Sequence, residues 1–413
     1  MPGSSTTPGD RLRELRRRRG LTQEALAQRA GLSVGVVKKI EQGGGARIET
    51  YHALARALDV RTSRLFEPSS PGPDRTSDTE KINLMPLRQA ISPAITLTGR
   101  LRLADEVGEE PDLARLRSAV AAAARAYHHD RYADMASLLP ELIRSARAAV
   151  EFHASGAEHA QALGIRSEVL QVAGRYLTQI RVYDLAHMAL RDAVVDAVQA
   201  GDRLNAASAI IGQAWILLRQ GRLDEAEDLA IATADEIEPR FSQATREHLA
   251  AWGWLLLRAS AAASRNNKPD LAADMIGLAR AAGTAIGAEV TDELRGWGTF
   301  GPLTVELKAI ENVMVAGRPD AVLEMSERLP RGVGRATSDN WNRHRLDVAR
   351  AHAMLRHEAE TTRLLMALRA DAPEWLRHQR LAEDAFRDGV LRTRKRTLTG
   401  EQRDLAHFLR IED

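Results

Sequence analysis

From residue 83 to the end, apolar residues recur with a helical spacing of about 3.6 in almost every window, and strand patterns are nearly absent. Alanine, leucine, arginine and glutamate dominate this part of the chain. Helices with apolar stripes bury them by packing on other helices. We therefore expect an all-α fold.

The helical segment also repeats. Short helices that follow a turn begin near six positions, spaced roughly 40 to 50 residues apart, and each follows a longer amphipathic helix. Stacked helix pairs of this kind bury a continuous core and curve into a concave surface. We interpret residues 83–413 as a tetratricopeptide-like solenoid, with an ordinary helical bundle as the alternative. The six positions are Asp130, Ile180, Gly221, Asn267, Gly317 and Leu355.

Positive charge is concentrated at the front of the chain. Residues 1–68 hold 13 Lys and Arg against 7 Asp and Glu, out of 58 and 56 in the whole chain of 413 residues, so the first segment has a net charge of +6 and the remainder −4. A basic segment joined to a larger acidic one indicates a polyanion-binding head on a body with another role.

The basic segment divides into short helices. We expect a disordered tail over residues 1–9, a helix capped by Asp10 and running to Arg19, and a second helix capped by Thr22. Gly31 provides a sharp turn, and Ser33 caps a third helix. A fourth helix over 46–60 and a fifth over 62–66 complete a domain at residues 10–67. The Pro- and Ser-rich residues 68–82 form a linker.

Several classes of protein are disfavoured. The chain has no cysteine, and its N-terminus lacks the apolar core of a signal peptide. Its most apolar stretches, such as Ala209 to Leu218, are shorter than a membrane span. Metalloprotease, hydrolase, P-loop and dinucleotide motifs are missing, so we expect no enzyme, cofactor or metal. The adjacent His128 and His129 point to different helix faces, which disfavours a metal site. We expect a cytoplasmic, nucleoid-associated protein.

Residues 9–66 resemble the lambda repressor and Cro-like, or xenobiotic response element, family of helix-turn-helix domains. The resemblance rests on "LRELRRRRGLTQEALAQRAGLSVGVVKKIEQG", followed by "LARALDV" and "LF". It implies that the third helix enters the DNA major groove, that Gln23 and Ser33 bind phosphates, and that Gln23 also braces the third helix. It further implies that Glu41 pairs with an arginine of the first helix, here Arg16. Members of this family generally bind DNA as dimers.

The same resemblance assigns the base-facing positions. Val34, Gly35 and Lys38 face the base edges, Lys39 lies beside them, and Arg47 follows in the next loop. Val34 and Gly35 cannot make bidentate hydrogen bonds to bases. We therefore expect few bases to be recognised through side-chain hydrogen bonds, and we expect DNA shape to contribute to specificity.

Helix-turn-helix heads on tetratricopeptide-like bodies resemble bacterial peptide-pheromone regulators and a set of actinobacterial regulators. The second resemblance rests on "GTFGPLTVELKAIENVMVAGRPDAVLEMSERLP" and "WNRHRLDVARAHAML", and it implies an effector or partner on the concave face. Aromatic and polar residues near these stretches and on an earlier helix are candidate effector ligands, with core packing as the alternative. These candidates are Arg175, Tyr176, Gln179, Trp297, Phe300, Trp341, Asn342 and Arg345.

Trp215, Trp252 and Trp254 lie in apolar runs and are expected in the core. The basic cluster Arg392, Arg394, Lys395 and Arg396 is either a second phosphate contact or a solvated helix end.

The sequence thus predicts a homodimeric regulator that binds double-stranded operator DNA and responds to a peptide or small-molecule effector. The alternative is a DNA-tethered scaffold whose helical repeats bind a protein partner.

Overall fold

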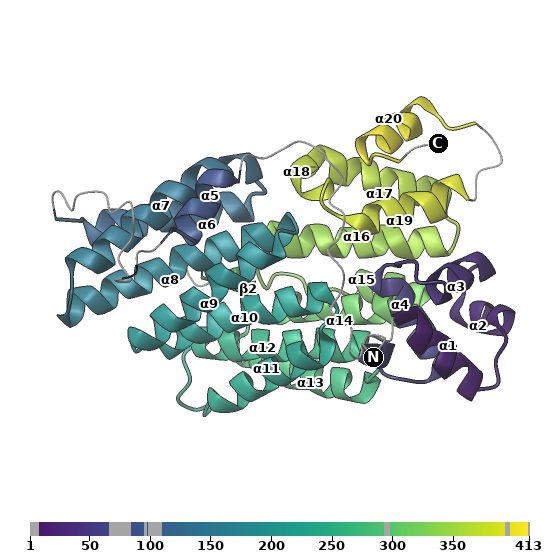
Figure 1. Ribbon diagram of the computed structural model, residues 1–413, viewed down its shortest axis with the longest axis horizontal. Helices are drawn as coiled ribbons and strands as arrows, with labels where there is room; N and C mark the ends of the chain where they lie inside the picture. Colours follow the sequence, from purple (N-terminus) through teal and green to yellow (C-terminus); the bar gives the residue numbers. More distant parts are fainter. Residues whose placement is uncertain are drawn as a thin grey trace.

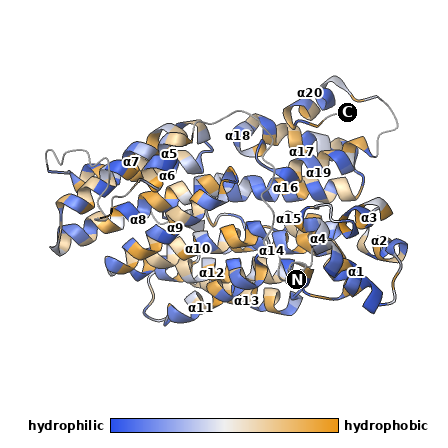
Figure 2. Cartoon of the chain, in the orientation of Figure 1, coloured by the Kyte–Doolittle hydropathy of each residue, from blue (hydrophilic) through white to orange (hydrophobic). Residues whose placement is uncertain are grey.

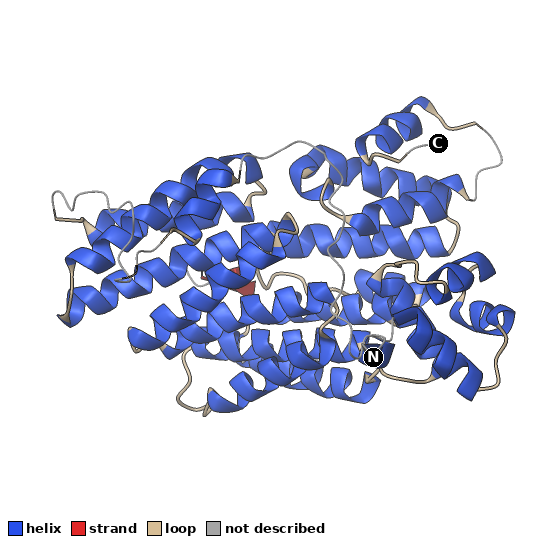
Figure 3. Cartoon of the chain, viewed as in Figure 1, coloured by secondary structure: helices blue, strands red, loops and turns tan. Residues whose placement is uncertain are grey.

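The computed structural model describes residues 8–65, 84–94, 97, 110–292, 298–392 and 397–411. In these residues it contains twenty α-helices and two short strands, which confirms the predicted all-α fold (Figure 3). Hydrophobic and hydrophilic residues are interspersed along the helices (Figure 2). In the described parts, no helix is both long and apolar enough to cross a membrane.

The N-terminal domain, which we call the head, packs around Leu12, Leu26, Ile40 and Leu54, all fully buried. It consists of α1 (Pro8–Arg18), α2 (Gln23–Ala30), α3 (Val34–Glu41), α4 (Ile48–Leu58) and the 3₁₀ turn η1 (Thr62–Leu65). The predicted fourth helix, 46–60, is therefore longer than the observed one.

The start of the first helix was predicted wrongly. Asp10 is not its cap, because the helix already begins at Pro8. Proline has no backbone N–H and is tolerated in a first helical turn, where that group lacks a partner in any case. Gly9 is buried so close to α3 that a Cβ there would meet the Ile40 carbonyl oxygen at 2.0 Å. The expected disordered tail therefore ends before residue 8, and residues 1–7 lie outside the described residues.

The rest of the chain, which we call the body, is built from six successive helix pairs with flanking elements (Figure 1). The pairs are α6 (Leu113–His128) with α7 (Tyr132–Phe152), α8 (Gly156–Gln179) with α9 (Tyr183–Gln199), α10 (Arg203–Gln220) with α11 (Leu223–Glu236), α12 (Arg246–Arg265) with α13 (Pro269–Ile286), α14 (Pro302–Val315) with α15 (Pro319–Glu327), and α16 (Ser338–Met354) with α17 (Glu358–Asp371). The flanking elements are α5 (Met85–Ile91), α18 (Pro373–Leu376), α19 (Arg380–Phe386), the π-turn η2 (Arg387–Leu391) and α20 (Gly400–Phe408).

The turns inside the six pairs have the same backbone geometry. In each, the residue two positions before the second helix has a positive φ, between 57° and 78°. These residues are Asp130, Arg181, Gly221, Asn267, Gly317 and Arg356. The recurrence supports the predicted repeat, since each second helix starts within a few residues of the position read from the sequence. The specific tetratricopeptide likeness remains a prediction.

The first helices of successive pairs pack on one another, from α6 on α8 through to α14 on α16, and form one layer. A short antiparallel pair of strands packs against α12 and α14: β1 (Val290–Asp292) pairs with β2 (Gly298–Phe300). The indole N–H of Trp254 donates to the Thr299 carbonyl at 2.9 Å, which fixes the hairpin against α12.

The body closes on itself. Ser338, at the start of α16, donates a hydrogen bond to the carbonyl of His128 in α6, and the Asn342 amide donates to Asp130 Oδ2 at 3.2 Å. One hydrophobic cluster joins residues of α5–α10 with residues of α16–α20. The polar groups on the first helices are therefore enclosed between the first and last pairs.

The head lies against one edge of the body, although the predicted linker, 68–82, lies outside the described residues. His52 and Thr62 both bond the carbonyl of Arg265 at the end of α12, and the N–H of Ser63 donates to Asn266 Oδ1 at 3.0 Å. Burial lowers the pKa of His52 to about 4, so this contact is made by the neutral imidazole.

Three consecutive turns of the body form this docking edge. The Asn267 amide donates to the Val60 carbonyl at 3.4 Å. A Cβ at Gly221 would lie 2.9 Å from Ile48 Cδ1, and one at Gly317 would lie 3.0 Å from a terminal nitrogen of Arg56. Glycine at these two turns therefore permits the left-handed backbone conformation and also leaves room for α4 to approach closely.

We predict that Arg356→Gly stabilises the protein. Arg356 is exposed and adopts φ 62°, a conformation that costs a non-glycine residue about 1–2 kcal/mol. Glycine relieves this cost but loses more backbone entropy on folding, which offsets part of the gain. The free energy of unfolding should therefore rise by about 0.5–1 kcal/mol, measured by urea denaturation. The matched control is Arg363→Gly, an exposed position within α17, which should lower it by about as much. Destabilisation by both variants would refute the proposed strain.

Candidate nucleic-acid interface and interior polar site

The turn between α2 and α3 has the predicted cap at Thr22 and the predicted sharp turn at Gly31, but not the predicted cap at Ser33. Thr22 accepts a hydrogen bond from the N–H of Ala25 at 3.0 Å, and Gly31 ends α2 with a left-handed φ of 67°. Ser33 precedes α3 with extended backbone, but its hydroxyl makes no capping hydrogen bond and the residue is exposed. Two short helices thus meet at a tight corner, and the N-terminus of the second is open to solvent.

Glu41, at the end of α3, is the buried anchor of the head. Arg16 donates to both of its carboxylate oxygens, at 2.6 Å and 2.9 Å, and the Gln23 amide donates at 2.7 Å. Burial alone would raise the pKa of Glu41, but these donors outweigh it and hold the pKa below its usual value. The predicted Arg16–Glu41 pair is confirmed. Gln23, assigned to a phosphate, braces the recognition helix through Glu41.

The outer face of α3 is free of the body. Gly35, Lys38 and Lys39 are exposed and Val34 is half-buried, whereas Val37 and Ile40 are fully buried in the head. Two ammonium groups and an exposed helix N-terminus on one surface provide the positive charge and the N–H donors that bind phosphate. This face is the candidate nucleic-acid interface.

Arg47 lies away from this face. Its guanidinium pairs with Glu383 at 3.5 Å and with Asp384, both in α19 of the body. The arginine is partly buried there, and burial lowers its pKa although the neighbouring carboxylates oppose this. Arg47 therefore ties the head to the body in this structure, and its predicted DNA contact requires these pairs to break.

Four of the predicted effector residues come together inside the body. Arg175, Tyr176 and Gln179 are buried on α8, and Asn342 reaches the same region from α16. The Tyr176 ring contacts Tyr132 edge-on at 6.1 Å, and the Arg175 guanidinium lies 5.4 Å from the centre of the Tyr127 ring.

The other predicted effector residues lie elsewhere. Phe300 is fully buried and packs on Gly253, where a Cβ would meet its ring at 2.0 Å. Arg345 pairs with Asp371 at 2.7 Å, and Trp341 is 42% exposed beside His344. Trp297 lies outside the described residues.

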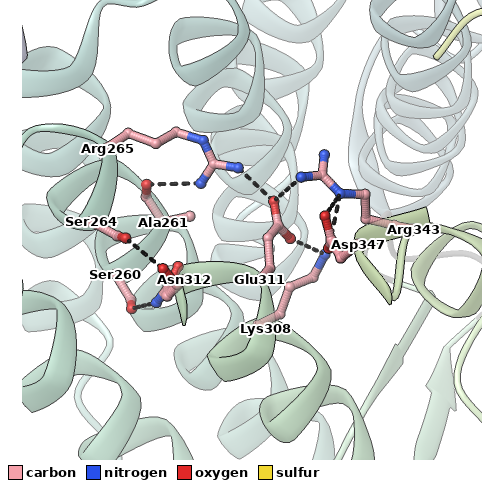
Figure 4. Close-up of polar contacts among 9 residues, drawn as sticks. All are labelled: Ser260, Ala261, Ser264, Arg265, Lys308, Glu311, Asn312, Arg343 and Asp347. Atoms are coloured by element: carbon pink, nitrogen blue, oxygen red, sulfur yellow. Dashed lines mark hydrogen bonds and ion pairs between the residues drawn. The ribbon is translucent and has the colours of Figure 1, made fainter. Parts of the chain in front are cut away.

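The structure also reveals an ionic network that the sequence did not. Arg265, Lys308 and Arg343 converge on Glu311, at 2.6, 3.2 and 3.5 Å, and Arg343 also pairs with Asp347 at 3.1 Å (Figure 4). Burial would raise the pKa of Glu311, but the three cations hold it well below its usual value. Helical spacing could have indicated only the pairs within one helix, Lys308–Glu311 and Arg343–Asp347. The contacts that join the three first helices have no signal in the sequence.

Burial and pairing also bear on the predicted core tryptophans and on the basic cluster. Trp252 and Trp254 are buried as expected, whereas Trp215 is half-buried. Arg392 pairs with Asp388 at 2.6 Å, and the other members of its cluster, residues 394–396, lie outside the described residues. Across the described residues, no group of three metal-ligating side chains comes together.

We predict that Lys38→Ala combined with Lys39→Ala weakens DNA binding and flattens its salt dependence. Each lost phosphate contact lowers the slope of log K against log salt by about 0.9. Fluorescence anisotropy with a genomic DNA fragment across a salt series measures both effects. Arg144→Ala, on the exposed surface of α7, is the control and should change neither. An unchanged slope in the double variant would remove these lysines from the DNA backbone.

We predict that Glu41→Gln destabilises the head by about 3 kcal/mol, because it leaves Arg16 buried without its partner. A carboxyl with a lowered pKa contributes its stability above its unfolded pKa and loses it as pH falls through the folded pKa. The difference in stability between variant and wild type should therefore have its full size at pH 7 and become smaller in acid. Hydrogen exchange of the α1 and α3 amides measures it. Equal protection at pH 7 would contradict the anchoring role.

Comparison with known proteins agrees with this geometry. Residues 12–65 match the family model described as helix-turn-helix. No curated protein and no solved structure matched the chain significantly. The match spans α1 to η1 from Leu12 onward and leaves the body without an assignment. Residues 12–65 are thus a helix-turn-helix domain, the DNA-binding domain of a class of transcriptional regulators.

Proposed function

We propose that the protein is a homodimeric, cytoplasmic regulator that binds operator DNA through two heads and is modulated by an effector bound in the body. One observation supports this most directly. The reading face of α3 is exposed, while the opposite side of the same domain is docked onto three turns of the body. A change inside the body can therefore alter the placement of the head without obstructing its DNA-binding face.

On DNA, Ser33 and Lys39 would bind phosphates at the start and side of α3, and Lys38 would reach a base edge. Val34 and Gly35 would allow close approach with little hydrogen-bond readout. Gln23 would act by bracing α3, which its hydrogen bond to Glu41 supports. Much of the specificity then falls to DNA shape and to the spacing of the two half-sites.

Helix α12 supplies a route from the interior to the head. The side chain of Arg265 joins the Glu311 network, and the carbonyl of the same residue accepts hydrogen bonds from His52 and Thr62. An effector that shifts α12 would strengthen or weaken head docking, and with it the population of heads free to bind two half-sites.

We predict that Glu383→Gln combined with Asp384→Asn increases DNA affinity. The substitutions release Arg47 from its carboxylate partners, so that it can contribute one further phosphate contact and steepen the salt slope by about 0.9. Anisotropy across a salt series measures this. Glu401→Gln, on the exposed surface of α20, is the control. Unchanged affinity and slope would show that docking does not restrain Arg47.

Mapping genomic binding sites and measuring mass by sedimentation together test the proposal. A dimer with paired half-sites is expected. A monomer without sequence preference would overturn it. Copurification of a protein partner, with DNA binding indifferent to small molecules, would instead favour the DNA-tethered scaffold.

A further inference from the structure

Two arginines inside the body lack the carboxylate partners that several other interior arginines have. Arg166 pairs with Asp196 at 2.5 Å, Arg265 with Glu311 at 2.6 Å, and Arg343 with both Glu311 and Asp347. Among the described residues, no carboxylate lies within ion-pair distance of Arg175 or Arg258. Arg175 and Arg258 thus differ from these three paired arginines.

Arg175, on α8, is 5% exposed. Its Nε donates to the Gln171 carbonyl at 3.3 Å, but both terminal nitrogens are buried without a hydrogen-bond partner in the described structure. One face of the guanidinium lies over Tyr127. The hydrogen-bonding edge that remains is the one that binds a carboxylate or a phosphate through two parallel bonds.

Arg258, on α12, lies 5.1 Å from the ring centre of Trp254 and 5.5 Å from that of Trp215. Its Nε is buried and makes no hydrogen bond within the described structure. Every residue from Leu249 to Ala263 is buried except Arg258, which keeps accessible surface. An otherwise buried helix thus presents one accessible cation.

The aromatic rings do not account for the two charges. A cation–π contact stabilises less than the burial of an unpaired guanidinium costs. Burial lowers the pKa of Arg258 to about 10, so the group is still charged at neutral pH. Asp339 acts on both arginines and Glu311 on Arg258 at longer range, but no described carboxylate pairs directly with either guanidinium, so a direct anionic partner is missing among the described residues.

The two arginines belong to one region. Tyr127 and Asp339 lie within electrostatic range of both, and the contacts of Ser338 and Asn342 with α6 and its following turn close the body around them. Helices α6, α8, α12 and α16 supply these groups, and all are first helices of their pairs.

We propose that Arg175 and Arg258 bind the negatively charged group of a small organic anion, a carboxylate or a phosphate, whose apolar part packs against Tyr127 and Trp254. The site deepens the proposed function by naming the chemical class of the effector. Anion binding can be measured without DNA, so the existence of the site does not depend on the proposed function. Only the claim that the anion regulates DNA binding rests on it.

The test uses the full chain with benzoate, phenyl phosphate and inorganic phosphate as probes, each against chloride at equal ionic strength. At least one probe should raise the melting temperature and change the fluorescence of the tryptophans beside Arg258. Arg175→Met and Arg258→Met should each weaken this binding at least about tenfold. Arg345→Met, whose arginine pairs with Asp371 at the surface, is the control and should bind like wild type. A response to benzoate or to the phosphates alone identifies the anion.

A second measurement needs no ligand. Without a bound anion, Arg175→Met removes an unpaired buried charge, and Arg258→Met removes a partly accessible charge whose Nε is buried without a hydrogen bond. Both variants should unfold at the same or a higher temperature than wild type. Arg343→Met leaves the buried Asp347 without its ion-pair partner and removes one of the three cations around Glu311, so it should unfold at a lower temperature. Lower melting temperatures for the first two variants, or no response of the wild type to any probe, would overturn the proposal. Anion binding without any effect on DNA affinity would leave the site standing and refute its regulatory role.

Discussion

The burial of α12 on all its sides is the constraint on which the rest of the structure depends. A helix that is apolar all round is stable in water only when other helices cover it completely. Helices α10, α11, α13 and α14 and the β1–β2 hairpin pack on it, and Figure 1 shows it within the body. Its polar groups must therefore find their partners inside the protein. Ser260 accepts from the Asn312 amide at 2.6 Å, and Arg265 meets Glu311.

The same helix joins the two functional regions. Arg258 lies at the interior site, and two turns further on the carbonyl of Arg265 receives hydrogen bonds from the head. A carbonyl at a helix C-terminus has no partner within its own helix, which makes it available to another domain. Head and body thus share a rigid element, and this is the physical basis of the proposed regulation.

Within the head, one buried carboxylate positions the recognition helix. Glu41 is held by Arg16 of α1 and Gln23 of α2, so the orientation of α3 is set by the head alone. Docking to the body uses α4 and η1 instead. This division lets the position of the head change while its DNA-binding face stays intact.

Local signals in the sequence were sufficient for much of this architecture. Thr22 and Gly31 were correctly placed at the ends of α2, and the starts of the second helices of the pairs were placed within a few residues. The Arg16–Glu41 pair followed from the family resemblance. Pro8 was wrongly left in the tail, because the close contact of Gly9 with Ile40 that holds this turn cannot be seen locally.

The sequence by itself determined the helices, their pairing and the character of the head, because caps, turns and apolar periodicity act over a few residues. Only the tertiary structure decided which charges are paired. Arg47 and Glu383 are far apart in the chain, as are Arg265 and Glu311. The sequence around Arg258 does not show that it lacks an ion-pair partner, because this depends on the helices that pack around it. Ion pairing depends on distances of a few ångströms between side chains, and the closure of the body sets those distances.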